Sequence, residues 1–492
     1  MKAANRKIAL NTILLSATEL FTRMVSLVLV IFVARRLGPG MIGIYAFALT
    51  FVNFFDIFIS FGLERYIQRE VGRQPDLAGP LFSQVFALKL LAYIGSAVVI
   101  VILSLTIVEG DLKRWVVWLL SLSLFFRTNI TSSNCFFRAH QQAKYEALVV
   151  ISFRLVYGGA GLAAILSGQD LLTLAALELT AQAGACSLAW WLFIKKIGNP
   201  FHRVTWNNLL TLVRSTKDFL FIRVALTVYA ALNMFMLSFM AGDVVTGIYA
   251  AALRLCGSFD FLPDAFTGAF LPVMSRQIKS GWESFATVFR PFFKYLLVIG
   301  LGLAAVLGGM AEGFILLIFG PAFKPAIPTL SILALSLALT FVNMSLSNGL
   351  ITLDRERKIV WIILLAAACN LCLNLALIPV YQQNGAAGAT LISEVLVLFL
   401  MLQTMGWQQV RILGLGRVTL RPLLAGLLSF GLGRGLVAWQ INFFGGLALM
   451  VLGFFFFLVC TGALSRKELL AAWDLITWKH KESEAARAGG GA

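Results

Sequence analysis

Five arginines lie inside apolar stretches of the chain, where a charge is costly. Each stretch is about 20 residues long, enough to cross the hydrocarbon core of a bilayer. An arginine near the bilayer centre costs about 2.5 to 3.5 kcal/mol to insert, so we interpret such residues as functional. They are Arg23, Arg127, Arg154, Arg223 and Arg254.

Polar residues of the first apolar stretch share one helix face. Thr12, Ser16, Glu19, Arg23 and Ser26 follow one another at spacings of three and four residues. Such a face must contact water or other polar groups. We interpret Arg23 as a binding residue and Glu19 as a candidate for the cavity or for ion coupling. The alternative is a structural pair in which Glu19 and Arg23, one turn apart, neutralise each other.

Depth in the membrane separates the other arginines. Arg127 and Arg254 lie well inside their stretches, so we rank them with Arg23 as candidate binding residues. Arg154 lies about three turns from the inner end of its helix, from which a long side chain can extend to the membrane surface. We therefore rank Arg154 below the other three.

The stretch that contains Arg254 also carries two acids. Asp260 and Asp264 share one face, and Pro263 between them is expected to bend the helix and free a carbonyl group. Two acids beside a proline inside the membrane indicate a candidate proton or cation site. The alternative is that they pair with arginines of neighbouring helices, for example Arg223, and only neutralise them.

Asparagines form a third polar set. Asn343 lies on one predicted helix, and Asn370 and Asn374 lie one turn apart on the next. Such amides either join helices by hydrogen bonds or bind a sugar, and helix packing is the simpler interpretation.

Composition defines the class of protein. Of 492 residues, 59% are hydrophobic and 13% are charged, with a mean hydropathy of +0.87. Soluble domains carry about 25% charged residues, so we predict an all-α polytopic membrane protein. The net charge of +17 lies in short clusters between apolar stretches, which is typical of cytoplasmic loops and argues against nucleic-acid binding. Cysteines fall inside predicted spans, so neither a disulfide nor a metal site is expected.

The apolar stretches predict about 14 transmembrane helices. Lysines and arginines concentrate on one side of this arrangement, which places both termini in the cytoplasm. An amphipathic segment in the basic tail is expected to lie on the inner leaflet. The predicted spans are 8–34, 41–62, 80–108, 115–138, 145–167, 170–194, 218–241, 245–274, 285–309, 326–352, 358–379, 386–408, 419–440 and 443–464.

An internal repeat organises these spans. The segment Gly43-Ile-Tyr-Ala with Asp56 recurs at a constant spacing as Gly247-Ile-Tyr-Ala with Asp260, which makes Asp56 a further candidate for the cavity. The repeat carries the second span onto the eighth, so the two copies have the same orientation in the membrane, as in transporters that rock two halves around a central site. We expect an N-lobe at 1–195, a cytoplasmic loop at 196–217, a C-lobe at 218–408, two extra helices at 419–465 and a cytoplasmic tail at 466–492.

Two segments resemble a known family. Asn370 to Tyr381, which ends in Ile-Pro-Val-Tyr, and the Gly-Ala-Ala that begins at Gly385 look like a motif of Wzx-type polysaccharide flippases. Residues 34–63 resemble the start of the same family, which belongs to the multidrug, oligosaccharidyl-lipid and polysaccharide exporter superfamily. One departure is Gln382, where the family usually has glycine.

The resemblance implies two six-helix lobes with two additional helices in the bacterial plasma membrane. It implies a non-enzymatic flippase that moves undecaprenyl-diphosphate-linked oligosaccharide to the outer leaflet. The partners that it implies are membrane lipids, a polysaccharide polymerase and glycosyltransferases. Arg23 and Arg254 match helices that carry cavity arginines in related lipid II flippases, and Arg127 is added on depth alone. Guanidinium groups suit a diphosphate because they bind phosphate bidentately.

Other functions stay open. A lipid II flippase shares the expected cationic cavity, whereas a multidrug or metabolite exporter is expected to use acids and aromatic residues. An enzyme needs catalytic groups in a large outer loop, which the sequence lacks. No cofactor is expected, and transport is expected to couple to H⁺, Na⁺ or the membrane potential. Moving about two negative charges outward through roughly 100 mV gains about 4 to 5 kcal/mol.

Overall fold

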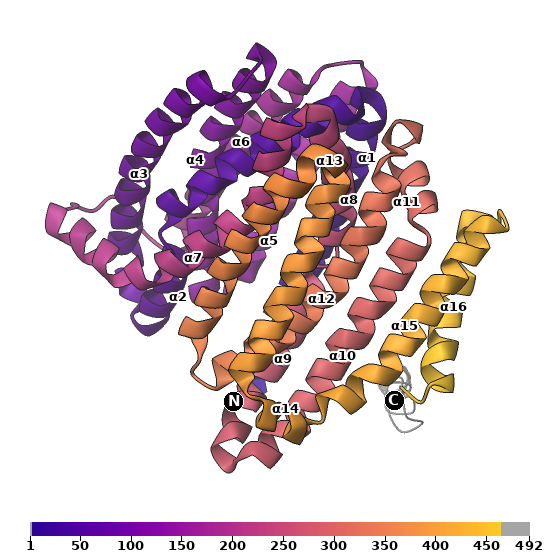
Figure 1. Ribbon diagram of the computed structural model, residues 1–492. Coiled ribbons are helices and arrows are strands. Elements are labelled where there is room, and N and C mark those ends of the chain that lie inside the picture. The colour runs from indigo at the N-terminus through magenta and orange to yellow at the C-terminus, as the bar shows by residue number, and fades with distance from the viewer. Residues whose placement is uncertain (1, 464–492) are drawn as a thin grey trace, which may run out of the picture. The chain divides into compact units, whose positions relative to one another are not determined.

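The computed structural model describes the backbone of residues 2–463 (Figure 1). Within that range, the side chains of residues 2–10, 12, 13, 217–223, 225, 226 and 417 are not described, and the predicted tail helix lies outside the described residues. The described residues form helices joined by short turns. The first half comprises α1 (Lys2–Ser60), α2 (Leu63–Arg73), η1 (Pro75–Leu77), α3 (Ala78–Ile107), α4 (Asp111–Ala139), α5 (Ala143–Leu166), α6 (Leu171–Lys196), α7 (Trp206–Met240) and α8 (Gly242–Gly257).

The helices continue in the second half of the chain. They are α9 (Phe261–Gln277), η2 (Ile278–Ser280), α10 (Trp282–Gly309), α11 (Ala311–Ile318), η3 (Pro321–Phe323), α12 (Ala326–Thr352), α13 (Glu356–Met405), α14 (Trp407–Leu413), α15 (Leu415–Ala438) and α16 (Phe443–Cys460). Ten helical stretches of the described chain are long and apolar enough to cross a bilayer. The all-helical membrane class is confirmed, and the count of about 14 spans stays a prediction.

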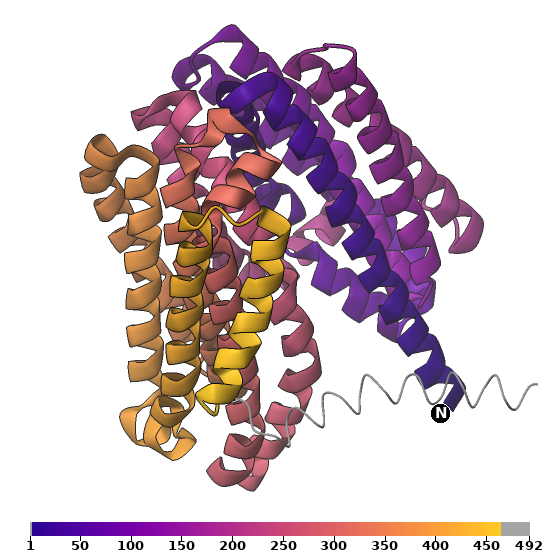
Figure 2. The same ribbon diagram turned by 90° about the vertical axis from the view of Figure 1, so that its right-hand side faces the viewer.

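Two pairs of predicted spans are joined across sharp breaks rather than loops. Helix α1 breaks at Gly38, with φ 78° and ψ 179°, directly before Pro39, and Figure 2 shows its long indigo N-terminal half leading to this turn. Helix α13 breaks at Gln382, with φ 49° and ψ −127°. Glycine adopts this backbone region readily and glutamine does not, which explains why the flippase family favours glycine there.

The prediction that the helix bends at Pro263 is wrong about the position of the bend. Helix α8 ends at Gly257 and α9 begins at Phe261, so the chain breaks before the proline. Pro263 lies in the first turn of α9, where a missing N–H removes no intrahelical hydrogen bond. Asp260 and Asp264 therefore lie at the start of a new helix.

The chain forms two compact units. The first comprises Met1–Arg254, Ile315–Ala326 and Ile363–Ala389, and the second comprises Leu255–Phe314, Ile327–Ile362 and Thr390–Ala492. In the second unit, α15 packs beside both α10 and α16 (Figures 1 and 2).

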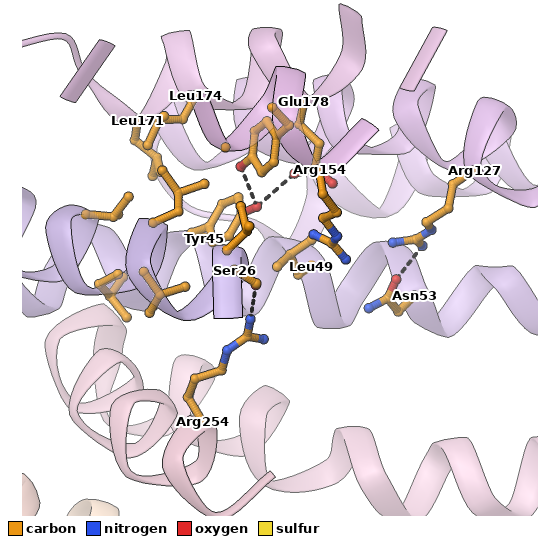
Figure 3. A pocket seen from close by; sticks show the side chains of 17 residues that line it. Ser26, Tyr45, Leu49, Asn53, Arg127, Arg154, Leu171, Leu174, Glu178 and Arg254 are labelled. Atoms are coloured by element: carbon orange, nitrogen blue, oxygen red, sulfur yellow. Dashed lines mark hydrogen bonds between the residues drawn. The ribbon is translucent and has the colours of Figure 1, made fainter. Parts of the chain in front are cut away.

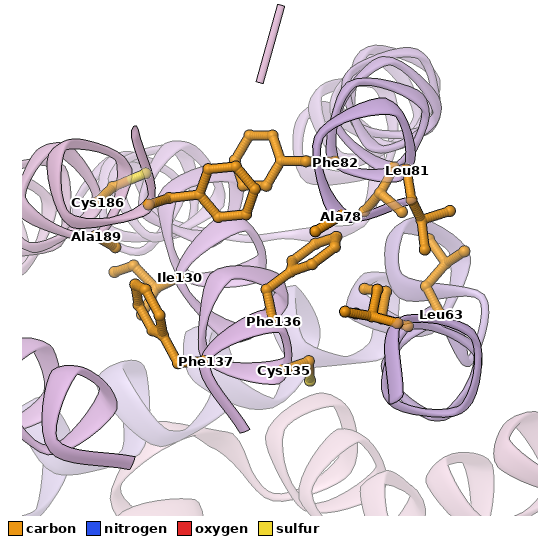
Figure 4. Packing of buried hydrophobic residues seen from close by; sticks show 14 of the residues in the cluster. Leu63, Ala78, Leu81, Phe82, Ile130, Cys135, Phe136, Phe137, Cys186 and Ala189 are labelled. Atoms are coloured by element: carbon orange, nitrogen blue, oxygen red, sulfur yellow. The ribbon is translucent and has the colours of Figure 1, made fainter. Parts of the chain in front are cut away.

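An aromatic core joins α3, α4 and α6 in the first unit (Figure 4). The ring centroids of Phe82 and Phe193 lie 4.1 Å apart, and Phe136 lies 5.5 Å from Phe82. Cys135 and Cys186 belong to this core and are buried, as expected of small apolar side chains. This core fixes the positions of α4 and α6, two of the helices that line the cavity described below.

The two copies of the repeat contact each other within the first unit. A Cβ atom on Gly43 would lie 1.8 Å from the carbonyl oxygen of Asp243, and one on Gly247 would lie 1.8 Å from that of Pro39. Both positions therefore require glycine. Small residues let two helix backbones approach this closely inside a membrane, so the repeated glycines bring α1 and α8 together.

Candidate functional site

A cavity of about 260 Å³ lies in the first unit, between α1, α4, α5, α6 and α8 (Figure 3). Much of its wall is aliphatic, which lowers the local dielectric constant and strengthens interactions between charges. The aliphatic lining residues are Val25, Leu29, Val30, Val33, Ile42, Leu49, Leu171 and Leu174.

Three arginines line this cavity, and neutral groups hold two of them. Arg127 donates a hydrogen bond to Oδ1 of Asn53, and Arg254 donates one to Oγ of Ser26. In Figure 3, Arg127 and Arg154 extend from one side of the cavity and Arg254 from the opposite side. The amide of Asn53 and the hydroxyl of Ser26 orient these guanidinium groups without adding a negative charge to the cavity.

Of the three arginines, Arg154 has the fewest hydrogen bonds to its guanidinium donors. Its Nε atom is buried and has no hydrogen-bond partner among the described residues. Its guanidinium group lies 5.1 Å from the ring centroid of Phe153, a cation–π contact that holds the side chain but uses no N–H donor. A buried donor without a partner is rare in folded proteins, and here it faces a cavity that can hold an acceptor.

One acid, Glu178, lies in the wall among these arginines. Its side chain is buried, and its Oε2 accepts a hydrogen bond of 2.8 Å from the hydroxyl of Tyr45. That hydroxyl lies 3.1 Å from the hydroxyl of Tyr157. Arg127 and Arg154 attract the carboxylate, but no described cation lies within ion-pair distance of it.

The structure brings two of the three first-ranked arginines together. Arg127 and Arg254 line the cavity, whereas Arg23 does not. Arg23 instead forms an ion pair of 2.9 Å with Glu19, and both side chains are partly exposed. This is the geometry of the structural alternative, although Arg23 lies one turn before Ser26 on the same helix and so near the cavity rim.

The predicted acids lie apart from the cavity lining. Asp56 accepts a hydrogen bond of 2.9 Å from Ser60, its neighbour one turn later. Asp260 and Asp264 are exposed in the second unit. The side chain of Arg223 lies outside the described residues.

The asparagines make contacts between helices. Asn343 donates hydrogen bonds to the backbone and the carboxylate of Glu394 within the second unit, at 3.0 and 2.7 Å. In the first unit, Asn374 bonds to Asn370 at 2.8 Å and to Asn233 at 2.6 Å. The bonds of Asn343 to Glu394 and of Asn374 to Asn233 join different helices, as expected of amides that pack helices, whereas the bond to Asn370 lies within α13.

The sequence analysis ranked one cavity residue, Arg154, too low. It did not identify three others, which are Glu178, Tyr45 and Tyr157. The repeat contained a signal for one of them, because Tyr45 belongs to the Gly-Ile-Tyr-Ala segment. Its counterpart Tyr249 also meets a polar side chain, accepting a hydrogen bond of 3.1 Å from Asn233. Nothing in the sequence indicated that Glu178 and Tyr45 meet.

Solved structures share this fold. The lipid II flippase MurJ in an inward closed conformation has a TM-score of 0.70 at 14% identity, over 93% of this chain and 100% of that one. An inward-facing multidrug resistance MATE family transporter of the MOP superfamily has a TM-score of 0.64 at 14% identity, over 83% of this chain and 99% of that one. The chain thus shares the fold of these two structures, and its apolar helices are those of a multi-pass membrane protein.

Within that class, the chain belongs to the polysaccharide biosynthesis protein family, whose model matches residues 8–278, more than half of its length. It is also similar to the probable flippase AglR of Haloferax volcanii, with 29% identity over 176 residues. That match covers 34% of this chain and 36% of AglR, so it spans about a third of the relative's length. The family resemblance expected from the sequence is confirmed.

Proposed function

We propose that this protein is a flippase that moves a diphosphate-linked lipid oligosaccharide from the inner to the outer leaflet of the bacterial plasma membrane, for polysaccharide synthesis. The observation that carries the proposal is the cavity with three arginines, one of which has a buried donor that meets no acceptor among the residues that the structure describes. Arg127, Arg154 and Arg254 would replace the water that the diphosphate loses on entry. Arg23, near the rim, would contact the headgroup as it enters.

The charge of the cavity favours this function over drug export. An exporter of organic cations needs acids and aromatic faces to receive its ligand. This cavity has two tyrosines, but its charged groups are three guanidinium groups and one carboxylate, so cations outnumber acids. A lipid II flippase would share the preference for a diphosphate, and MurJ carries that name. The family match with polysaccharide biosynthesis proteins favours an oligosaccharide over a peptidoglycan precursor.

The transport cycle in this proposal is alternating access by two six-helix lobes, residues 1–195 and 218–408, with both termini in the cytoplasm. Outward movement of about two negative charges is favoured by an inside-negative membrane potential, which alone can drive export. Glycosyltransferases would supply the lipid-linked oligosaccharide, and a polymerase would consume it.

Transport in reconstituted vesicles tests the proposal. Purified protein is placed in liposomes with a fluorescent oligosaccharide on a polyprenyl diphosphate, and an impermeant quencher reports movement between leaflets. Loss of a charge-assisted hydrogen bond costs about 1.5 to 3 kcal/mol, so Arg154→Gln should slow transport by about 10- to 100-fold. Arg154→Lys should retain part of the rate, because it keeps the charge but loses the bidentate geometry.

Arg434 provides the matched control, because it is an exposed arginine of α15 in the second unit. Arg434→Gln should transport at the wild-type rate. Full activity of Arg154→Gln at normal protein levels would remove Arg154 from the site, and an inactive wild type in this assay would contradict the proposed substrate.

A further inference from the structure

The function proposed above does not account for Glu178. A buried carboxylate in a site for anions repels the ligand that the arginines attract. It is also held in place, since Tyr45 donates a hydrogen bond to its Oε2 atom. An acid fixed in this way alters what the site binds, and its effect grows with the charge of the ligand.

The charged and titratable groups around Glu178 come from each neighbouring helix. They are Tyr45 of α1, Arg127 of α4, Arg154 and Tyr157 of α5, and Arg254 of α8. With Glu178 ionised, three guanidinium groups and one carboxylate leave a net charge of two positive units on the lining. That charge neutralises a ligand with two negative charges, whereas a third negative charge would be buried without a counter-charge and would carry the cost of its desolvation.

Lipid diphosphates come in two charge states, which depend on whether a sugar is attached. A diphosphate esterified at both ends has one ionised oxygen on each phosphorus, hence two negative charges. Without the sugar, the terminal phosphate gains a second ionisable oxygen with a pKa of about 6, hence a third charge above neutral pH. The two lipids differ by one charge at the group that the arginines would hold.

We propose that Glu178 is a specificity-determining residue, through which the cavity favours the sugar-loaded lipid diphosphate, with two charges, over the unloaded lipid diphosphate, with three. The inference rests on the proposed function, because it assumes that the cavity holds the diphosphate. Repulsion by Glu178 acts on both lipids and is stronger for the one with the additional charge. A flippase built in this way exports the sugar-bearing lipid and leaves the unloaded lipid diphosphate in the inner leaflet.

Binding of two probes that differ only in the sugar tests this inference. The probes are farnesyl diphosphate and farnesyl-diphospho-N-acetylglucosamine, with binding to detergent-purified protein measured by calorimetry at pH 8. Wild type should bind the sugar-bearing probe more tightly. In Glu178→Gln both probes should bind more tightly. The gain in affinity should be roughly three- to tenfold larger for farnesyl diphosphate than for the sugar-bearing probe.

Two further variants complete the comparison. Glu178→Asp keeps the charge and should keep the wild-type preference between the two probes. Binding by this variant also provides a readout if Glu178→Gln fails to fold. Glu70→Gln removes an acid of α2 that lies outside the cavity lining, and its ratio should equal that of wild type.

The outcomes separate the two proposals. If neither probe binds wild type, the proposed diphosphate site is wrong. If wild type binds both probes but favours farnesyl diphosphate, or if Glu178→Gln binds with an unchanged ratio, the specificity role of Glu178 is overturned while the diphosphate site stands.

Discussion

Neutral hydrogen-bond acceptors determine how the cavity arginines behave. Asn53 and Ser26 hold Arg127 and Arg254, and neither acceptor carries a charge. An ion pair would orient an arginine equally well, but it would neutralise the charge that a ligand needs. Arg23 shows the contrast, since its partner is the carboxylate of Glu19.

Exchange of the charges of Glu19 and Arg23 tests whether this pair is structural. If Arg23 contacts the headgroup, as proposed, the double variant Glu19→Arg with Arg23→Glu should fold but transport poorly, because the cation has moved one turn, about 6 Å. Arg23→Gln should slow transport less than Arg254→Gln, because Arg23 lies outside the lining. The liposome assay measures both, and wild-type transport by the exchanged protein would assign Arg23 to the structural pair alone.

Breaks in the long helices depend on single backbone positions. At Gly38 the break falls on a glycine, which adopts positive φ freely, whereas in α13 it falls on Gln382. A side chain in this region of φ and ψ carries a strain of about 1 to 3 kcal/mol. The turn in α13 is therefore held by the packing around it rather than by its own residue.

Gln382→Gly should raise the free energy of unfolding by about 1 kcal/mol, because it removes this strain. Thermal unfolding of the detergent-purified protein, followed by tryptophan fluorescence, measures the effect. The control is Gln403→Gly in the same helix, where the backbone is helical and glycine should destabilise by about 0.5 to 1 kcal/mol. A lower midpoint for Gln382→Gly than for wild type would contradict the assignment of strain.

The crossing of α1 and α8 should tolerate no side chain. Gly43→Ala forces a Cβ atom against the carbonyl of Asp243, and overpacking of this kind costs about 1 to 3 kcal/mol or more. We expect a lower thermal midpoint and less folded protein in the membrane. Gly159→Ala in α5 is the control, because nothing lies within 4 Å of its new Cβ atom, and equal midpoints for the two variants would contradict the close approach.

For the whole molecule, the orientation in the membrane is the prediction to test. Reporter fusions at Gly308, near the end of α10, and at Gln383, beside the break in α13, should both read as external. A fusion at Gly281, between η2 and α10, should read as cytoplasmic. A cytoplasmic signal from Gly308 or Gln383 would contradict the 14-helix topology.

The sequence predicted the helices better than the site. Apolar length locates the two halves of α1 as the predicted spans 8–34 and 41–62, because this signal is local, although a sharp break at Gly38 stands where a loop was expected. Helical spacing also placed Arg127 and Arg254 deep in the membrane, and they meet in one cavity. The same reasoning misjudged Arg154 and missed Glu178, since spacing gives the depth of a residue and not its neighbours. The contact between Tyr45 and Glu178 depends on how α1 packs against α6, which no local pattern encodes.

The glycine contact between the repeats has the pattern of a two-fold interface. Pro39 stands in the first copy where Asp243 stands in the second, and Gly43 corresponds in the same way to Gly247. Gly43 approaches Asp243 just as Gly247 approaches Pro39, so each half presents the same patch to the other. This reciprocity is that of an isologous homodimer. A half-length chain with this segment would already carry the self-complementary surface needed to pair with a second copy in the same orientation, and joining the two in one polypeptide would preserve that contact.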